Sequence, residues 1–348
     1  MLYVTTRNNR DAYTAHHALK DNRGPDGGLY VPFREPSFSP GEIASLREKS
    51  FNKCVSEVLN VLFNTHLSGY DIDFAIGRYS VRLEMLGKRI ILGECWHNLE
   101  SDFDRMVKNL TKLLLNEADK EPLPGDWAGI GIRIAVLFGI FGELMRQGIL
   151  NAEGTVDISV VSGDFSAPIS AWYARRWGLP IGNILCCCNE NGNLWDFICH
   201  GQLKTGDTAV PTVTPKADVV VPAGLERLIY SCAGTEEVEN YLKVLRSGGN
   251  YYLDDVLLHR LRQGLYVTVT SEHRVLSTIP SVFSTHARIL SPYSALAFAG
   301  LQDYRARTGE NRIALILEDR SPALDMETVS RAMGRSADLL KQHLIHNF

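Results

Sequence analysis

The chain has 348 residues, 45% of them hydrophobic and 22% charged, a composition typical of globular proteins large enough to bury a substantial core. Its formal net charge of -4 at pH 7 provides no basic surface of the kind that binds nucleic acid. The expected partner is therefore a small molecule or another protein.

The same sequence indicates where the protein works. Seven cysteines, an odd number and mostly scattered, argue against a disulfide framework and favour a reducing compartment. The opening residues MLYVTTRNNR carry no basic-then-apolar leader, so we expect no signal peptide. The longest apolar run, residues 134–142, is too short to span a bilayer. We expect a cytoplasmic protein that does not enter a membrane.

In chain order, the first predicted elements are short strands and one capped helix. Residues 1–7 are β-branched and aromatic, which predicts a strand, and the turn at 23–28 leads into a second strand that Pro32 ends. Ser39 is the predicted cap of a helix. Residues 90–93 form a short apolar run typical of a strand.

The middle of the chain predicts two helices separated by a linker. Residues 101–119 place their apolar side chains on one stripe with the helical period. The segment EADKEPLPGDW, residues 117–127, contains two prolines and is the clearest linker. A largely apolar helix is predicted at 127–150.

The second half of the chain alternates strands with helices. Such alternation predicts a mostly parallel α/β sheet that is covered by helices on both faces. The predicted strands are 155–161, 179–189, 217–224, 265–271 and 312–319, and the helices between them include 169–178 and 235–246.

Five segments, in a fixed order, resemble the threonine synthase family. That family depends on pyridoxal phosphate (PLP), has the type II fold, and converts O-phosphohomoserine and water to threonine and phosphate. No single segment is specific, but the ordered set covers nearly the whole chain. The segments are residues 6–36, around GPDGGLYVP; 160–197, around SGDFSAP and CNEN; 218–230, DVVVPAGLERLIY; 290–301, LSPYSALAFAGL; and 315–334, around LEDRSPALD.

The resemblance implies a tryptophan synthase β-like parallel-sheet core preceded by a threonine synthase N-terminal domain. It assigns residues 1–92 to the N-terminal domain and residues 93–348 to the core. In the family, a whole small domain with a Thr-Ser-Gly-Asp-Thr-Gly substrate loop lies between the PLP lysine and the phosphate loop. Here only 59 positions separate Asp104 from Gly163, and that motif does not occur among them. We therefore expect the small domain to be largely missing, excised around residues 115–126.

The lysine that forms the imine with PLP is also missing from its expected position. The family carries Glu-x-Phe-His-Gly-Pro-Thr-x-x-Phe-Lys-Asp. In this chain Glu94, Trp96, His97 and Phe103 hold the register, and the lysine position falls on Asp104. A carboxylate cannot form an imine, so the resemblance implies that the nucleophile of this chemistry is lost.

Asp104 has a structural interpretation and a catalytic alternative. Ser101 begins the predicted helix and Asp104 follows three residues later, which is the spacing of a capping box. Lys108 and Lys112 continue at intervals of four, so one favourable ion pair of about 0.2–0.5 kcal/mol is expected. The alternative is that Lys108 takes over the imine. One helical turn would move the amine by about 5 Å, which reaction geometry does not tolerate.

The loop that would cradle the PLP phosphate is altered as well. Where the family has Gly-Asn-Phe-Gly, this chain has Gly163, Asp164, Phe165 and Ser166, followed by Pro168. Asp164 places a negative charge where a dianion would bind, at a cost of about 1 kcal/mol per charge pair in water and about 4 at an effective dielectric near 20. The structural interpretation is an ordinary strand-to-helix turn with Ser166 as the cap and Pro168 in the first turn.

Three further positions of the resemblance carry different chemistry. Asp319 stands where the family places a threonine beside the pyridine nitrogen, Ser321 replaces a histidine, and Tyr293 replaces another histidine. An aspartate can bind a pyridinium, but here a loop carboxylate is the simpler interpretation. The cysteines of 186–188 lie in a predicted strand without zinc-site spacing, so no metal is expected.

The hypothesis from the sequence is a threonine synthase-like pseudoenzyme that acts by binding. Its expected partners are a second copy of the chain or a catalytic paralogue, and no cofactor is expected. One alternative is an active PLP-dependent lyase on O-phosphohomoserine that uses Lys108 or another lysine. The other is a sensor of a small metabolite.

Overall fold

The computed structural model describes residues 1–77, 81–96, 98–117, 125–151 and 154–347. Most of the predicted linker, residues 118–124, and His97 lie outside the described residues.

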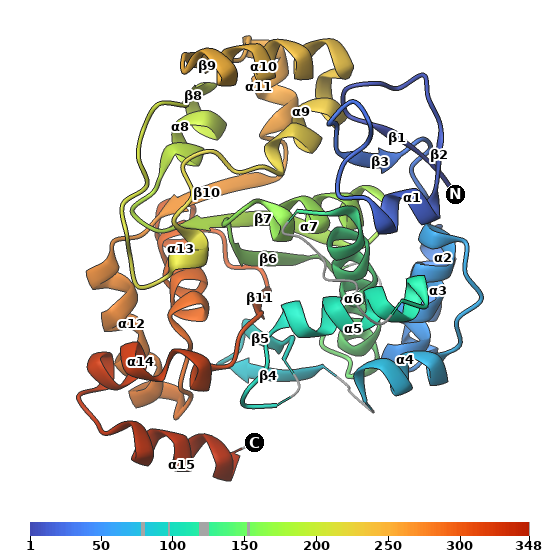
Figure 1. Cartoon of the computed structure of the whole chain (residues 1–348). Coiled ribbons are helices and arrows are strands. Elements are labelled where there is room, and N and C mark those ends of the chain that lie inside the picture. The colour runs from blue at the N-terminus through green and yellow to red at the C-terminus, as the bar shows by residue number, and fades with distance from the viewer. Residues whose placement is uncertain (78–80, 97, 118–124, 152–153, 348) are drawn as a thin grey trace.

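A six-stranded sheet forms the centre of the molecule (Figure 1). Five neighbouring strands are parallel, and β4 at one edge runs antiparallel to β5. The mostly parallel sheet predicted from the alternation of elements is therefore confirmed. In sheet order the strands are β10 (Leu265–Val269), β7 (Ile181–Cys188), β6 (Val156–Val161), β11 (Ala314–Glu318), β5 (Ile90–Glu94) and β4 (Arg82–Leu86).

The sheet separates two hydrophobic cores because its side chains alternate between the faces. On β11, Leu315 and Leu317 join one core, whereas Ala314 and Ile316 join the other. The first core is completed by α3 (Phe51–Phe63), α5 (Phe103–Leu115), α6 (Trp127–Arg146) and α7 (Ser166–Arg176). The second is completed by α12 (Glu272–His286), α13 (Pro292–Thr308), α14 (Met326–Met333) and α15 (Ala337–Asn347).

The N-terminal residues form a small antiparallel sheet and short helices beside α6 (Figure 1). Ser39 caps α2 as predicted and forms a capping box with Glu42. The elements are β1 (Leu2–Thr5), β2 (Tyr13–Thr14), α1 (Ala15–Lys20), β3 (Tyr30–Pro32), α2 (Pro40–Ser45), η1 (Leu46–Glu48) and α4 (Gly69–Ile76). The predicted division between residues 92 and 93 falls inside β5, which pairs with β4 in the central sheet.

The crossover from β7 to β10 carries the helix predicted at residues 235–246 and several elements that were not predicted. It contains α8 (Asn193–His200), the two-stranded sheet of β8 (Gln202–Lys204) and β9 (Asn250–Tyr252), η2 (Pro215–Ala217), α9 (Leu225–Ala233), α10 (Thr235–Ser247) and α11 (Asp255–Leu261). The strand predicted at 217–224 is wrong, since η2 ends at Ala217 and residues 218–224 are irregular. After β11, η3 (Pro322–Asp325) leads into α14.

Helix α6 lies in the middle of the first core. It is long and apolar enough to cross a membrane by length and composition, but most of it is buried inside the molecule. Two of its glycines face aromatic rings of α3: a Cβ added at Gly131 would lie 2.7 Å from Phe63, and one at Gly139 would lie 2.6 Å from Phe51. Close approach of α3 and α6 therefore requires these glycines.

The substitution Gly139→Ala tests this close approach. We expect it to lower the free energy of unfolding by about 1–3 kcal/mol, because overpacking outweighs the roughly 0.5–1 kcal/mol that alanine gains over glycine in a helix. The measurement is urea unfolding. Gly41→Ala in α2, where a Cβ meets nothing within 4 Å, is the matched control and should leave stability unchanged or slightly higher. Equal stability of the two variants would show that Phe51 moves aside freely.

Candidate functional site

A cleft of about 490 Å³ lies at the carboxyl ends of β6 and β11, bounded by the first turns of α5, α6 and α7. Ligands of parallel α/β folds bind at this edge of the sheet. The structure brings most of the predicted site residues together here: Asp104, Gly163, Asp164, Ser166 and Asp319 all line the cleft. Phe165 is buried, and Lys108 is not part of the lining.

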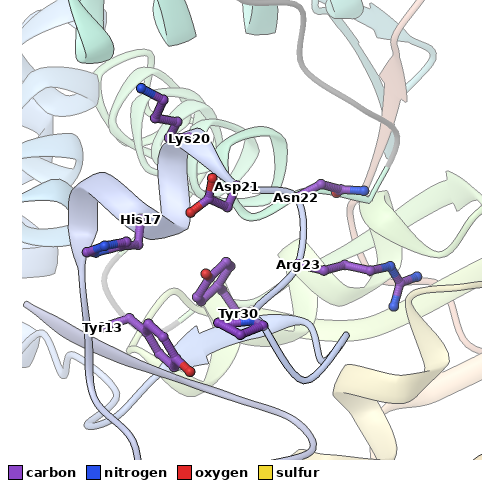
Figure 2. A pocket seen from close by; sticks show the side chains of 8 residues that line it. Tyr13, His17, Lys20, Asp21, Asn22, Arg23 and Tyr30 are labelled. Carbon is purple, nitrogen blue, oxygen red and sulfur yellow. The ribbon is translucent and has the colours of Figure 1, made fainter.

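A second hollow, of about 580 Å³, lies in the N-terminal part of the chain (Figure 2). Its lining includes His17, Lys20, Arg23 and Tyr30, and none of the predicted site residues. Burial raises the pKa of Tyr30 to about 12, so its hydroxyl is neutral and cannot act as a base near pH 7. Although this hollow has the larger volume, the position of the cleft at the strand ends makes the cleft the better candidate.

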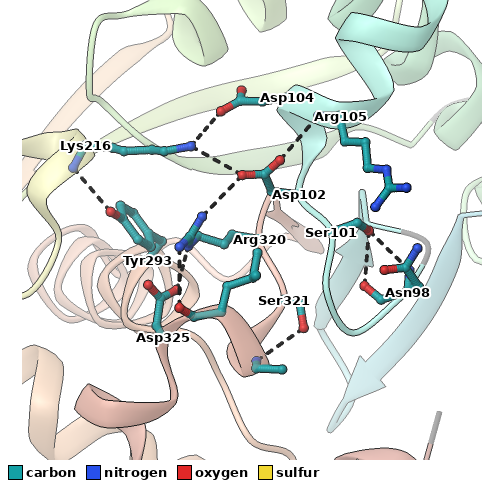
Figure 3. A network of polar contacts seen from close by, with 12 residues as sticks. Asn98, Ser101, Asp102, Asp104, Arg105, Lys216, Tyr293, Arg320, Ser321 and Asp325 are labelled. Carbon is teal, nitrogen blue, oxygen red and sulfur yellow. Dashed lines mark hydrogen bonds and ion pairs between the residues drawn. The ribbon is translucent and has the colours of Figure 1, made fainter.

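Asp104 lies in the first turn of α5, where the positive end of the helix dipole stabilises its negative charge. The predicted cap is wrong by one residue. Asp102 is the N-cap and accepts a hydrogen bond from the Arg105 amide, whereas the Ser101 hydroxyl donates to the Asn98 carbonyl (Figure 3). The Asp104 side chain is 71% exposed and pairs with Lys216.

Charged side chains of the cleft lining form one network of polar contacts (Figure 3). The Lys216 Nζ lies 2.6 Å from the Asp104 carboxylate and 3.4 Å from that of Asp102. Arg320 lies 3.2 Å from Asp102 and 2.8 Å from Asp325. Asp102 therefore joins a lysine and an arginine that come from two different segments of the chain.

The lysine of this network is held as a cation. Burial lowers the pKa of Lys216, but the hydrogen bond and charge of Asp104, with Asp102, raise it by more, so the amine titrates above its ordinary value. The backbone amide of Lys216 also donates to the Tyr293 hydroxyl at 3.2 Å. The main chain and the side chain of Lys216 are thus both fixed in the cleft lining.

In the loop before α7, a carboxylate accepts a hydrogen bond from the first amide of that helix. Both Asp164 carboxylate oxygens accept from Ser166, one from its amide at 2.9 Å and the other from its hydroxyl at 2.7 Å. Ser166 is therefore the first helical residue rather than the predicted cap, and the N-cap is Phe165 with φ of 74°. A carboxylate of the chain itself occupies the amide that an anionic ligand would use.

Asp319, the third altered position, forms an ion pair with a buried arginine. The Asp319 carboxylate lies 2.7 Å from the Arg133 guanidinium, which stacks 3.9 Å from the centre of the Phe103 ring. Arg133 comes from α6 and is almost fully buried. Asp319 therefore neutralises a buried cation of the core, which is a structural duty.

Next to the cleft, the ends of β5 and β11 carry buried carboxylates that share one cation. Arg288 lies 2.6 Å from Glu94, 2.7 Å from Glu318 and 3.3 Å from Glu84, and Arg82 lies 4.0 Å from Glu94. Burial raises the pKa of Glu94 to about 7; Arg288 opposes this shift and the charge of Glu318 adds to it. Three carboxylates facing two guanidiniums leave this cluster with an excess of negative charge.

Sequence reasoning missed four of the cleft residues, Asp102, Arg133, Lys216 and Arg320. Lys216 stands directly before the wrongly predicted strand at 217–224, and its partner Asp104 is 112 positions away. Asp102 had a signal, because aspartate is as good an N-cap as serine. The cysteines of 186–188 are buried in β7, and no group of three or more His, Cys, Asp or Glu among the described residues is arranged to hold a metal ion.

Solved structures share this architecture. PLP-bound threonine synthase from Brucella melitensis matches with a TM-score of 0.85 and 18% identity, covering 96% of this chain and 91% of that one. Threonine synthase from yeast matches with a TM-score of 0.82 and 16% identity, covering 96% and 90%. The fold is therefore that of the type II class of PLP-dependent proteins.

Within this fold class, sequence comparisons find similarity to threonine synthases. Residues 2–78 match the family model described as the threonine synthase N terminus. Threonine synthase of Pseudomonas aeruginosa is 25% identical over 453 aligned residues, covering 100% of this chain and 94% of the relative. The chain therefore resembles threonine synthases in sequence along its whole length, as well as in fold.

The chain also resembles longer relatives. Threonine synthase-like 1 of Homo sapiens is 25% identical over 215 residues, which cover 57% of this chain and 29% of the relative. The match thus spans less than a third of the length of that relative.

The Glu94 cluster predicts a pH-dependent stability. The folded protein holds the Glu94 proton up to about pH 7, whereas the unfolded chain releases it near the ordinary value of 4.5. The folded state binds more protons in this window, so this contribution to stability is complete below the lower value and is lost as the pH rises through the upper one.

The substitution Glu94→Gln removes the carboxyl group that titrates in this window. The difference in unfolding free energy, variant minus wild type, should rise by about 1–3 kcal/mol between about pH 5 and pH 8. Urea unfolding across this range measures it, and taking the difference cancels the titrating groups that do not interact with Glu94. A difference that does not change with pH would contradict the assignment.

The Lys216–Asp104 pair predicts a small coupling energy. Because both side chains are more than half exposed, a double-mutant cycle of Lys216→Ala and Asp104→Ala should give about 0.2–1 kcal/mol. The coupling should shrink in about 1 M NaCl, where screening is short-ranged. A coupling of zero at low salt would mean that the pair does not persist in solution.

Proposed function

We propose that this chain is a threonine synthase-like protein without the catalytic activity of that family and that it acts by binding. The observation that carries the proposal is the aspartate at the lysine position. Asp104 cannot form an imine, and its carboxylate is engaged by Lys216 at 2.6 Å.

The residues of the cleft do not fit PLP. Its phosphate would meet the Asp164 carboxylate, which already accepts from the Ser166 amide and hydroxyl. Its pyridine nitrogen would have to displace Arg133 from Asp319, leaving a buried guanidinium without its carboxylate. We therefore assign no step of a reaction to this cofactor.

A protein partner is the second part of the proposal. The resemblance implies that the small domain is missing around residues 115–126, and its loss would uncover apolar surface near the cleft, which a second copy of the chain or a catalytic paralogue would cover. Sedimentation at several concentrations tests the first of these. We place the protein in the cytoplasm because all seven cysteines are free.

The active-enzyme alternative now rests on a different lysine. Lys216 lines the cleft beside the lost lysine position, whereas Lys108 is not in the lining. Lys216 would have to lose a proton before attacking a carbonyl, and its raised pKa works against this. Lys216 is the better candidate for the imine because it lies beside Asp104. The same carboxylate raises the pKa of Lys216 and so keeps its amine charged.

An absorption spectrum with added PLP tests the proposal. We expect no aldimine band, and no pyridoxyl-lysine by peptide mass spectrometry after borohydride reduction. A band that survives in Lys108→Ala and vanishes in Lys216→Ala would establish the alternative and call for an assay with O-phosphohomoserine. Adducts spread over several exposed lysines would represent surface reaction, and they should persist in both variants.

A further inference from the structure

The lining of the cleft is acidic. Five aspartates and three basic residues face it, so the lining carries a formal charge of -2. The aspartates are Asp102, Asp104, Asp126, Asp164 and Asp319, and the basic residues are Arg133, Lys216 and Arg320.

Each basic residue of the lining is already paired with a carboxylate. Lys216 pairs with Asp104 and Asp102, and Arg133 pairs with Asp319. Arg320 is shared between Asp102 and Asp325, the latter outside the lining. A phosphorylated ligand would have to break one of these pairs before it found a cation.

Asp164 differs from the paired aspartates. Among the described residues no basic side chain lies within ion-pair distance of it, and its carboxylate accepts hydrogen bonds from Ser166. Arg227 is a fully buried cation near Asp164 that does not line the cleft. Its guanidinium donates to the carbonyls of Tyr30 and Gly125. Burial lowers the pKa of Arg227 to about 10, so it stays charged and offsets the acidic lining in part.

The remaining surface of the cleft suits a short hydrocarbon stem. Phe103, Val107, Val161, Ala167 and Leu317 line it, and a volume of about 490 Å³ holds a ligand of metabolite size. Arg133, lying over Phe103 and against Asp319, already shows within the chain how this surface accommodates a guanidinium.

We propose that the cleft binds a small organic cation, an alkyl amine or guanidine, with its charged head at Asp164 and its stem against the apolar wall. This inference rests on the proposed function, in that a cleft without PLP is free to take another ligand. The charge preference is opposite to the one that a phosphate cradle requires, since the helix terminus that would attract an anion is occupied by Asp164.

Thermal unfolding of the full chain tests the ligand class. The probes are agmatine and 1,4-diaminobutane, with 1,4-butanediol as the neutral analogue and O-phosphoserine as the anionic one, all at constant ionic strength. At saturating concentration either cation should raise Tm by about 2–4 °C, because a ligand of the folded state stabilises it. The diol and O-phosphoserine should leave Tm unchanged.

Two variants locate the effect. Asp164→Asn keeps an acceptor for the Ser166 amide and should reduce the Tm rise with agmatine to less than a third. Asp338→Asn on the exposed surface of α15 is the matched control and should keep the full rise. An equal loss in both variants, or a rise that survives in both, would overturn the assignment to Asp164.

The possible failures are separable. A Tm rise with O-phosphoserine and none with the cations would overturn the ligand class. No response to any probe, together with no aldimine band on adding PLP, would also overturn the ligand class while leaving the non-catalytic assignment intact. An aldimine band on Lys216 would overturn the proposed function itself.

Discussion

The ion pair between Lys216 and Asp104 joins two segments that are 112 positions apart in the chain. Both residues line the cleft, so the pair fixes the position of charged groups there. Its distance of 2.6 Å brings the crossover after β8 against the first turn of α5. Asp102 adds Arg320 to the same network, so the segment after β11 is held at the same point. Three parts of the chain meet there through ion pairs and through backbone hydrogen bonds such as that of the Phe103 amide to the Asp319 carbonyl.

Elements with a clear period were predictable, and residues with distant partners were not. Alternating and buried apolar runs gave β6, β7, β10 and β11, because a strand in a covered sheet must be apolar. Residues 218–224 have the same valine-rich composition but form no strand. The Asp218 carboxylate instead accepts from the Thr212 amide and from the side chain of Asn189, both at distances below 3 Å. Side-chain hydrogen bonds of this kind compete with a ladder, and composition does not reveal them.

The candidate site was predictable where the resemblance supplied a register. Asp104, Asp164 and Asp319 were singled out because each replaces a residue of different chemistry, and all three line one cleft. What each carboxylate does there required the fold: Asp104 meets Lys216, Asp164 meets the start of α7, and Asp319 meets Arg133. The cap at Asp102 was missed for a local reason, since two good capping residues stand side by side and sequence alone does not choose between them.

Two of these carboxylates, Asp164 and Asp319, act by the same physical principle. A fold that holds an anionic cofactor must present unsatisfied amides and cations to it, and without the cofactor those groups are left without partners in a partly dry site. In this chain carboxylates satisfy them, one at the start of α7 and one on the buried Arg133. The Ser166 amide and the Arg133 guanidinium therefore have their partners within the chain. The same carboxylates make the cleft unfavourable for an anionic ligand, because like charges repel each other.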